Sequence, residues 1–183
     1  KGKAQTGVEE IGHSEHRGTK QFFQPDDTIF TELVYNYDTL ANRLRELSYL
    51  NKGITITITD EREKLEDGTF KTETFHSQGG LKEFVEYIDG NRESIMEHVI
   101  FMEGERDDIP VEVAMRYNTS FNENLHSYVN NINTHEGGTH LAGFRRALTR
   151  TLKKYADELG LPAKEKVEVT GDDFREGLTA VIS

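Results

Sequence analysis

A pair of glycines followed by a strongly amphipathic run is the feature that most constrains this sequence. Gly137 and Gly138 allow backbone conformations closed to other residues, and Thr139 stands where an N-cap residue would accept a hydrogen bond from the first helical turn. The stretch predicts a helix from about residue 141 to residue 158. Its apolar residues recur at the three- and four-residue intervals of one helix face: Leu141, Phe144, Leu148, Leu152, Tyr155 and Leu159.

The opposite side of the predicted helix is basic. Arg146, Arg150, Lys153 and Lys154 fall well away from the apolar stripe, and Arg145 lies on its border. Such a concentration of positive charge is a candidate binding surface. A solvated face is the alternative, with cations near the C-terminal end favoured by the helix dipole, and periodicity alone favours that alternative.

The chain as a whole is acidic. Its 22 Lys and Arg residues stand against 33 Asp and Glu residues, which gives a net charge of −11. A chain of this charge does not wrap nucleic acid with its general surface, so any contact with nucleic acid must come from a local patch. The sequence has no Cys, which excludes disulfides and thiolate metal sites and fits a cytoplasmic protein.

The sequence shows no sign of a membrane partner. No apolar run approaches the roughly 20 residues of a membrane helix, and no signal peptide is recognisable. The chain begins at Lys1 and ends within a strand-like apolar run, 178–183. We therefore interpret the 183 residues as one domain, or one domain with a piece of another, excised from a longer protein.

Strand and helix signals mingle through the rest of the chain. The clearest strand covers 54–59, where Ile alternates with Thr, and Asp67-Gly68 predicts a tight turn to an antiparallel partner over 69–76. A helix capped by Asp38 or Thr39 precedes this hairpin. Helices, hairpins and a long crossover predict an α+β or mixed α/β fold. The other predicted elements are strands over 5–11, 18–24, 98–102, 109–117, 123–131 and from 178, a helix over 81–88, and a helical turn within 171–177.

Two short motifs are candidates for chemistry, and neither fits it well. A zinc-protease helix needs two histidines four residues apart on one face, whereas His135 and His140 are five apart across a Gly-Gly break, so we predict no metal site. Asp172 and Asp173 are adjacent at a helix start, where capping is a commoner role than acid–base catalysis. Without a phosphate loop, nucleophile elbow or dinucleotide fingerprint, we predict no catalytic residues.

Ordered motifs along the whole chain resemble the DNA gyrase B family of type IIA topoisomerases. The sister family, the B subunit of topoisomerase IV, is the alternative, and the LAGFR run at 141–145 favours gyrase. The matching motifs are Gly18-Thr19 with Pro25, LANRLRELSYLN (40–51), GGLKEFVEY (79–87), EGGTHLAGFR (136–145), LTRTL (148–152) and GDDFREGL (171–178).

The resemblance implies two domains. Residues 1–24 would be the C-terminal strands of a GHKL-type ATPase domain, and residues 30–183 would be most of the transducer domain. That domain is similar to domain 2 of ribosomal protein S5, an α+β unit with a four-stranded sheet packed by a long helix. The implied function is to couple ATP binding and hydrolysis to clamp closure and DNA strand passage in negative supercoiling. We expect flexing near 24–30, which is rich in Pro and Asp.

The resemblance also implies that the nucleotide site is incomplete in this sequence. Thr19 matches a threonine that lines the family's ATP pocket. The family's catalytic glutamate, magnesium asparagine, adenine aspartate and glycine-rich lid are absent, and its glutamine and lysine for the γ-phosphate come after the last strand. We therefore expect a piece of an ATP-hydrolysing topoisomerase that is inactive in isolation, with ATP and Mg²⁺ bound only by the full-length protein.

The basic side of the predicted helix acquires a role from the same resemblance. Arg145 matches a family arginine that faces the cavity through which DNA passes, and Arg146 and Arg150 are candidates for the same lining. The implied partners are DNA, the gyrase A protein and a second copy of gyrase B in the ATP-bound clamp. The competing hypothesis is a free-standing S5-like module that binds nucleic acid tightly by itself.

Overall fold

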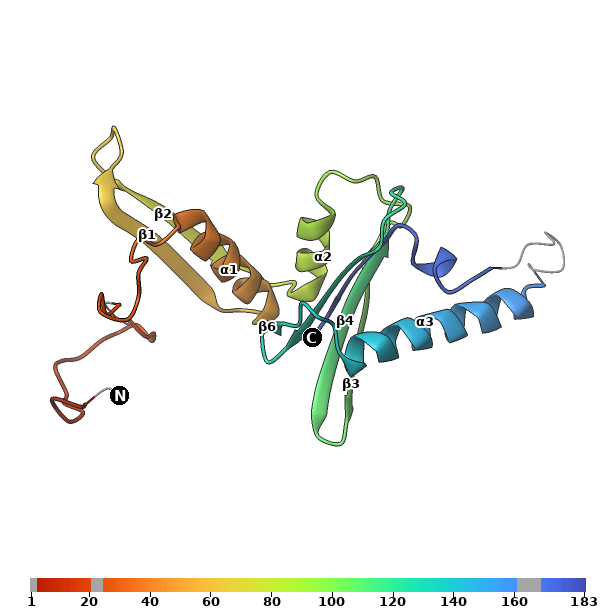
Figure 1. Cartoon of the computed structure of the whole chain (residues 1–183), viewed down its shortest axis with the longest axis horizontal. Helices are drawn as coiled ribbons and strands as arrows, with labels where there is room; N and C mark the ends of the chain where they lie inside the picture. Colours follow the sequence, from red (N-terminus) through yellow and green to blue (C-terminus); the bar gives the residue numbers. More distant parts are fainter. Residues whose placement is uncertain (1–2, 21–24, 161–168) are drawn as a thin grey trace. The chain divides into compact units, whose positions relative to one another are not determined.

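The computed structural model describes residues 3–20, 25–160 and 169–183 (Figure 1). The chain divides into two compact units, Lys1–Tyr35 and Asn36–Ser183. Within residues 3–20, 25–160 and 169–183, none of the helices combines the length and the apolar character needed to cross a bilayer.

The described residues of the first unit form neither a helix nor a strand, and almost all of their side chains are exposed. The strand expected over 5–11 is therefore wrong, as is the described part, 18–20, of the strand expected over 18–24. An extended segment becomes a strand only when a partner takes its backbone hydrogen bonds. No described segment forms such a ladder with these residues. Residues 21–24 lie outside the described part of the chain.

The second unit begins with helix α1 (Tyr37–Leu50) and the hairpin of β1 (Thr55–Lys64) and β2 (Phe70–His76). The predicted turn at Asp67-Gly68 and the antiparallel pairing are confirmed. The helix cap was misplaced, because Asn36 rather than Asp38 or Thr39 caps α1 and accepts a 2.9 Å hydrogen bond from the Thr39 amide. Ala41 and Phe75 form the centre of the small core between α1 and the hairpin.

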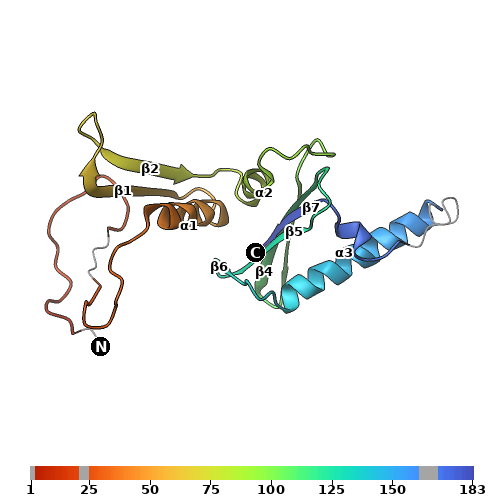
Figure 2. The same cartoon turned by 45° about the horizontal axis from the view of Figure 1, so that its top comes forward.

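The main sheet has five strands in the order β3-β4-β7-β5-β6 (Figure 2). The expected number was four. The extra strand arises because Asn130 and Asn131, both with positive φ, form a tight turn that lets β6 (Ile132–Asn133) pair with β5 (Asn124–Val129). Strands β3 (Ile100–Arg106) and β4 (Ile109–Tyr117) correspond to the strands predicted over 98–102 and 109–117, and they pair as a second hairpin.

Strand β7 (Leu178–Ile182) is the centre of this sheet. It pairs antiparallel with β4 and parallel with β5, and each of its five residues is buried. Parallel neighbours need a long crossover connection. Helix α3 (Thr139–Glu158) and the 3₁₀ turn η1 (Asp173–Arg175) lie in the crossover between β5 and β7, so the predicted crossover is confirmed.

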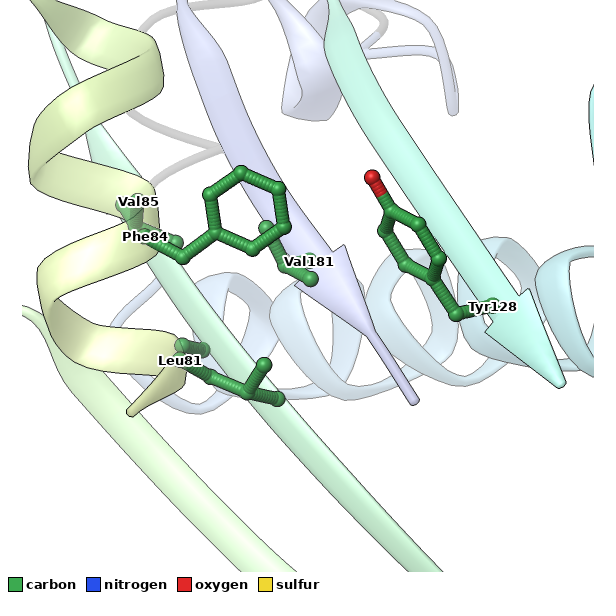
Figure 3. Packing of buried hydrophobic residues seen from close by; sticks show 6 residues of the cluster. Leu81, Phe84, Val85, Tyr128 and Val181 are labelled. Carbon is green, nitrogen blue, oxygen red and sulfur yellow. The ribbon is translucent and has the colours of Figure 1, made fainter. Parts of the chain in front are cut away.

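Side chains alternate between the two faces of the sheet, and both faces are covered. On one face, Leu81, Phe84 and Val85 of helix α2 (Leu81–Asp89) pack against Val181 and Tyr128 (Figure 3). Helix α3 packs on the other face. The expectation of one long covering helix was therefore incomplete, since α2 covers the second face. Burial also raises the pKa of Tyr128 to about 12.

A buried polar network joins α2 to the central strands. Asp89 is 2 % exposed, and its Oδ1 accepts hydrogen bonds from Thr179 Oγ1 at 2.6 Å and from Asn118 Nδ2 at 2.7 Å. Arg116 Nε lies 3.5 Å from Asp89 Oδ2 and balances its charge. A buried carboxylate is tolerated only when it is paired and hydrogen-bonded, so this network fixes one arrangement of α2 on the sheet.

Gly177, in the turn before β7, has less room for a side chain than any other described glycine. Its φ is +70°, and a Cβ there would lie 2.4 Å from the backbone oxygen of Asn118. We predict that Gly177→Ala lowers the free energy of unfolding by at least about 1–3 kcal/mol, the cost of the backbone conformation alone. The measurement is urea denaturation of the chain.

Gly143 provides the matched control. It lies in α3, where an added Cβ would meet nothing within 4 Å, and its φ is outside the left-handed region. Gly143→Ala is expected to raise the free energy of unfolding by about 0.5–1 kcal/mol, because alanine is the better helix former. Equal effects of the two substitutions would contradict the assignment of strain to Gly177.

Candidate nucleic-acid interface

Helix α3 begins directly after the Gly-Gly pair. Gly137 has a φ of +79°, a conformation that favours glycine. The ring of His140 lies 2.7 Å from where a Cβ of Gly138 would stand, so a side chain at position 138 would displace that ring. The predicted N-cap is wrong by one residue. Gly138 is the cap, and Thr139 is the first helical residue without a side-chain capping bond.

Helix α3 is held against the sheet from its start to Leu152. Phe144, Leu148 and Leu152 pack with Met115 and Leu178, and Leu148 is 8 % exposed. The predicted apolar stripe is therefore confirmed over these turns. Its last two members differ, because Tyr155 and Leu159 remain 59 % and 47 % exposed beyond the apolar residues of the sheet.

The outward side of α3 carries the predicted cations. Among the described residues, Arg146, Arg150 and Lys153 have no ion-pair partner, and all three are exposed. Lys154 has only a long contact, 3.8 Å, with Glu158. With Arg145, α3 holds five Lys and Arg residues against two Asp and Glu residues, in a chain whose net charge is −11. An open groove of about 700 Å³ runs along these side chains.

Arg145 differs from its neighbours because it is paired. Its Nε and Nη2 donate to the two carboxylate oxygens of Glu123 at 3.0 and 2.9 Å, a bidentate geometry. Its side chain is still 41 % exposed. Of the three predicted cavity-lining arginines, Arg146 and Arg150 can bind an anion without breaking an ion pair among the described residues. Arg145 must first give up its pair with Glu123.

Arg175 is a member of this site that the sequence pattern did not single out. Its guanidinium reaches from η1 to α3, where Nη1 donates to Thr149 Oγ1 at 3.4 Å. The same Nη1 donates to the Gly171 oxygen at 2.7 Å, and Nε lies 3.0 Å from Glu123 Oε1. The Nε–H is not aligned with that oxygen, so the contact with Glu123 is an ion pair without a hydrogen bond. Glu123 was also missed, because neither residue belongs to a periodic pattern.

The remaining sequence candidates include Thr19 and the two histidines near the start of α3. Thr19 is exposed in the first unit. His135 precedes α3 and His140 lies in its first turn, where Nε2 is 3.3 Å from Thr134 Oγ1. Within the described ranges, no group of three or more His, Asp and Glu side chains is placed to hold a metal ion.

The capping role predicted for the acidic pair at η1 is wrong for its side chains, because Asp172 is the N-cap residue but makes no side-chain capping hydrogen bond. Asp173 accepts hydrogen bonds from the backbone and hydroxyl of Thr170 at 2.6 and 2.8 Å, and the backbone bond is the main reason that its pKa is lowered. Asp172 pairs with Arg175. A lowered pKa keeps Asp173 ionised, which is unsuited to a general acid at neutral pH.

Comparison with known families identifies the larger protein group. The family model for DNA gyrase B matches residues 80–183, which include α2, the five-stranded sheet and the basic helix. The chain belongs to the DNA gyrase B family. Relatives support this membership over the full chain, including the DNA gyrase B proteins of Cytophaga aurantiaca, 66 % identical, and Cytophaga hutchinsonii, 63 % identical.

This gyrase B family chain spans 38 % of the length of each of those two relatives. Among solved structures it is similar to the 43K ATPase domain of Thermus thermophilus gyrase B, determined in complex with an aminocoumarin. That match has a TM-score of 0.73 at 33 % identity and covers 87 % of this chain and 42 % of the other. The gyrase B protein of Myxococcus xanthus, at 23 % identity and a TM-score of 0.71, shows the same fold.

The orientation of the basic face depends on how α3 is anchored. We predict that Leu148→Ala lowers the free energy of unfolding by about 2–5 kcal/mol, because it leaves a cavity between α3 and the sheet. Leu159→Ala is the matched control, and its half-exposed side chain is expected to contribute less than about 1 kcal/mol. Urea denaturation distinguishes the two, and a similar loss from both would contradict anchoring by the part of α3 that ends at Leu152.

Proposed function

We propose that this chain is the transducer part of a DNA gyrase B protein. In this role it couples ATP binding and hydrolysis to clamp closure and DNA strand passage in ATP-dependent negative supercoiling. One observation carries the proposal: a chain of the gyrase B family presents unpaired cations, among its described residues, on a helix anchored to a sheet that is covered on both faces. The relatives, which are named as gyrase B proteins, favour gyrase over topoisomerase IV.

The domain assignment is part of the proposal. Residues 30–183 would be a transducer of the ribosomal protein S5 domain 2-like class, and residues 1–24 the end of a GHKL-type ATPase domain. The mixed sheet with α3 in its crossover supports the first assignment. The division of the chain into two compact units, the first of which ends at Tyr35, supports a domain boundary in this part of the chain.

The chemistry of α3 suits a transient contact with DNA. Arg146, Arg150 and Lys153 offer positive charge to phosphates without the bidentate base contacts that read a sequence. Phosphate contacts of this kind are independent of sequence and weaken as salt rises. The acidic remainder of the chain opposes wider wrapping, so DNA is bound only locally and can leave.

A transducer must also move as a body. The buried β7 strand, the two covered faces and the Asp89 network resist internal rearrangement. A nucleotide signal at one end would then shift the position of α3 rather than deform it. The full-length protein would bind ATP and Mg²⁺ and act in the cytoplasm with the gyrase A protein and a second copy of gyrase B, while this chain alone would have no catalytic residues.

The DNA contact is tested in the full-length protein assembled with the gyrase A protein. For Arg146→Glu with Arg150→Glu, we predict weaker supercoiling and a higher DNA concentration for half-maximal ATPase stimulation. The dependence of that DNA affinity on salt should become shallower by about 0.9 in logarithmic slope for each phosphate interaction that is removed, about 1.8 for both.

Arg106→Glu is the control, because it reverses one charge, as each substitution of the double variant does. Arg106 lies at the end of β3 with its side chain 92 % exposed and has only a 3.7 Å contact with Asp107. It is expected to retain the stimulation and the salt slope of the unmodified protein. An unchanged slope in the double variant would refute the proposed DNA contact.

The isolated 183-residue chain provides a separate prediction. We expect no ATP turnover above background and only weak binding to duplex DNA, because Thr19 lacks the rest of a nucleotide pocket and the net charge is −11. Phosphate release and fluorescence anisotropy measure the two quantities. Tight DNA binding by this chain alone would instead favour the free-standing nucleic-acid-binding module.

A further inference from the structure

Glu123 is shared by two arginines from different elements. It directly precedes β5, Arg145 lies in the second turn of α3, and Arg175 lies in η1. The carboxylate makes its aligned, bidentate contact with Arg145, whereas Arg175 contacts only Oε1 and without hydrogen-bond alignment. The stronger pair is therefore the one that includes Arg145, the arginine of the two that lies in α3 beside Arg146.

The two arginines differ in what else holds them. Arg175 is 16 % exposed and is fixed independently by the Gly171 oxygen and by Asp172. Among the described residues, Glu123 is the sole charged partner of Arg145. If Arg145 turns to an external anion, Glu123 keeps the ion pair with Arg175. The exchange leaves no isolated carboxylate, so its cost is low.

We propose that Glu123 is a positioning residue that limits how strongly Arg145 binds DNA phosphate. It holds the guanidinium at the border of the basic face and competes with phosphate for the same N–H donors. This proposal rests on the DNA contact proposed above, and it assigns a role to a residue of opposite charge within that surface. Arg175 supports this role, because its ion pair with Glu123 remains while Arg145 binds phosphate.

The competition explains why an acidic side chain stands beside a phosphate-binding surface. Without it, Arg145 would add a full charge to Arg146 and Arg150 and strengthen the hold on DNA. With it, each interaction of Arg145 with phosphate is offset by the breaking of a bidentate pair. A segment that must pass through needs weak contacts on both arrival and departure, and the Glu123 carboxylate provides this balance.

The experiment compares Glu123→Gln with the unmodified full-length protein assembled with the gyrase A protein. The probe is linear duplex DNA, titrated in DNA-stimulated ATPase assays at several KCl concentrations between about 50 and 200 mM. Over this range the DNA affinity changes enough to measure the number of phosphate contacts. We expect the DNA concentration for half-maximal stimulation to fall about two- to fivefold. The salt slope should steepen by at most about 0.9, the value for one full phosphate contact.

Two further variants separate this role from other effects. Glu103→Gln removes the same charge from an exposed position on β3 and is expected to change neither quantity. In an Arg145→Gln background, Glu123→Gln should have a much smaller effect, because only its ion pair with Arg175 remains. The half-maximal concentration does not depend on the fraction of active protein, so partial misfolding does not produce the expected shift.

The outcomes distinguish the two proposals. An unchanged or higher half-maximal concentration for Glu123→Gln would overturn the role of Glu123, as would an equal fall for Glu103→Gln or a full effect in the Arg145→Gln background. If the Arg146 and Arg150 charge reversals also leave the salt slope unchanged, the DNA contact itself is refuted. If those reversals flatten the slope, the DNA contact stands and only the role of Glu123 is rejected.

Discussion

The parallel pairing of β5 with β7 determines where the basic helix lies. Two parallel neighbours cannot be joined by a tight turn, so the chain between Val129 and Leu178 must cross over the sheet. Helix α3 lies in that crossover and buries Leu148 against one face. Because one side of the helix is fixed by the core, Arg146 and Arg150 on its other side are fixed toward solvent. The strand pairing thus positions charges that it does not contact.

The opposite face of the sheet shows how the body keeps one shape. Hydrophobic packing of α2 on Val181 and Tyr128 tolerates small displacements, whereas directional hydrogen bonds to a buried carboxylate do not. Asp89 receives such bonds from Asn118 and Thr179, which lie on two different segments of the sheet region. Packing therefore provides most of the stability, and the polar network selects the arrangement.

The sequence predicted much of this fold because most elements are periodic. The Ile–Thr alternation of β1 and the apolar stripe of α3 up to Leu152 are local, and the structure confirms both. The helix caps were less predictable, because local backbone geometry decides which residue becomes the cap. Asn36 caps α1 in place of Asp38 or Thr39, and Gly138 caps α3 in place of Thr139. The strand expected over 5–11 failed for another reason: a strand depends on a partner that its own sequence does not reveal.

The Glu123–Arg145 pair illustrates why the electrostatics of the candidate site lay beyond sequence reasoning. The residues are 22 positions apart, on elements brought together by the crossover, and no spacing rule links a strand start to the second turn of a distant helix. Their pairing also changes how the basic face is understood. Along the helix Arg145 adds to a ridge of charge, but in the folded chain it is largely satisfied. The available positive charge lies with Arg146, Arg150 and Lys153, and the contribution of Arg145 depends on whether phosphate can replace a carboxylate.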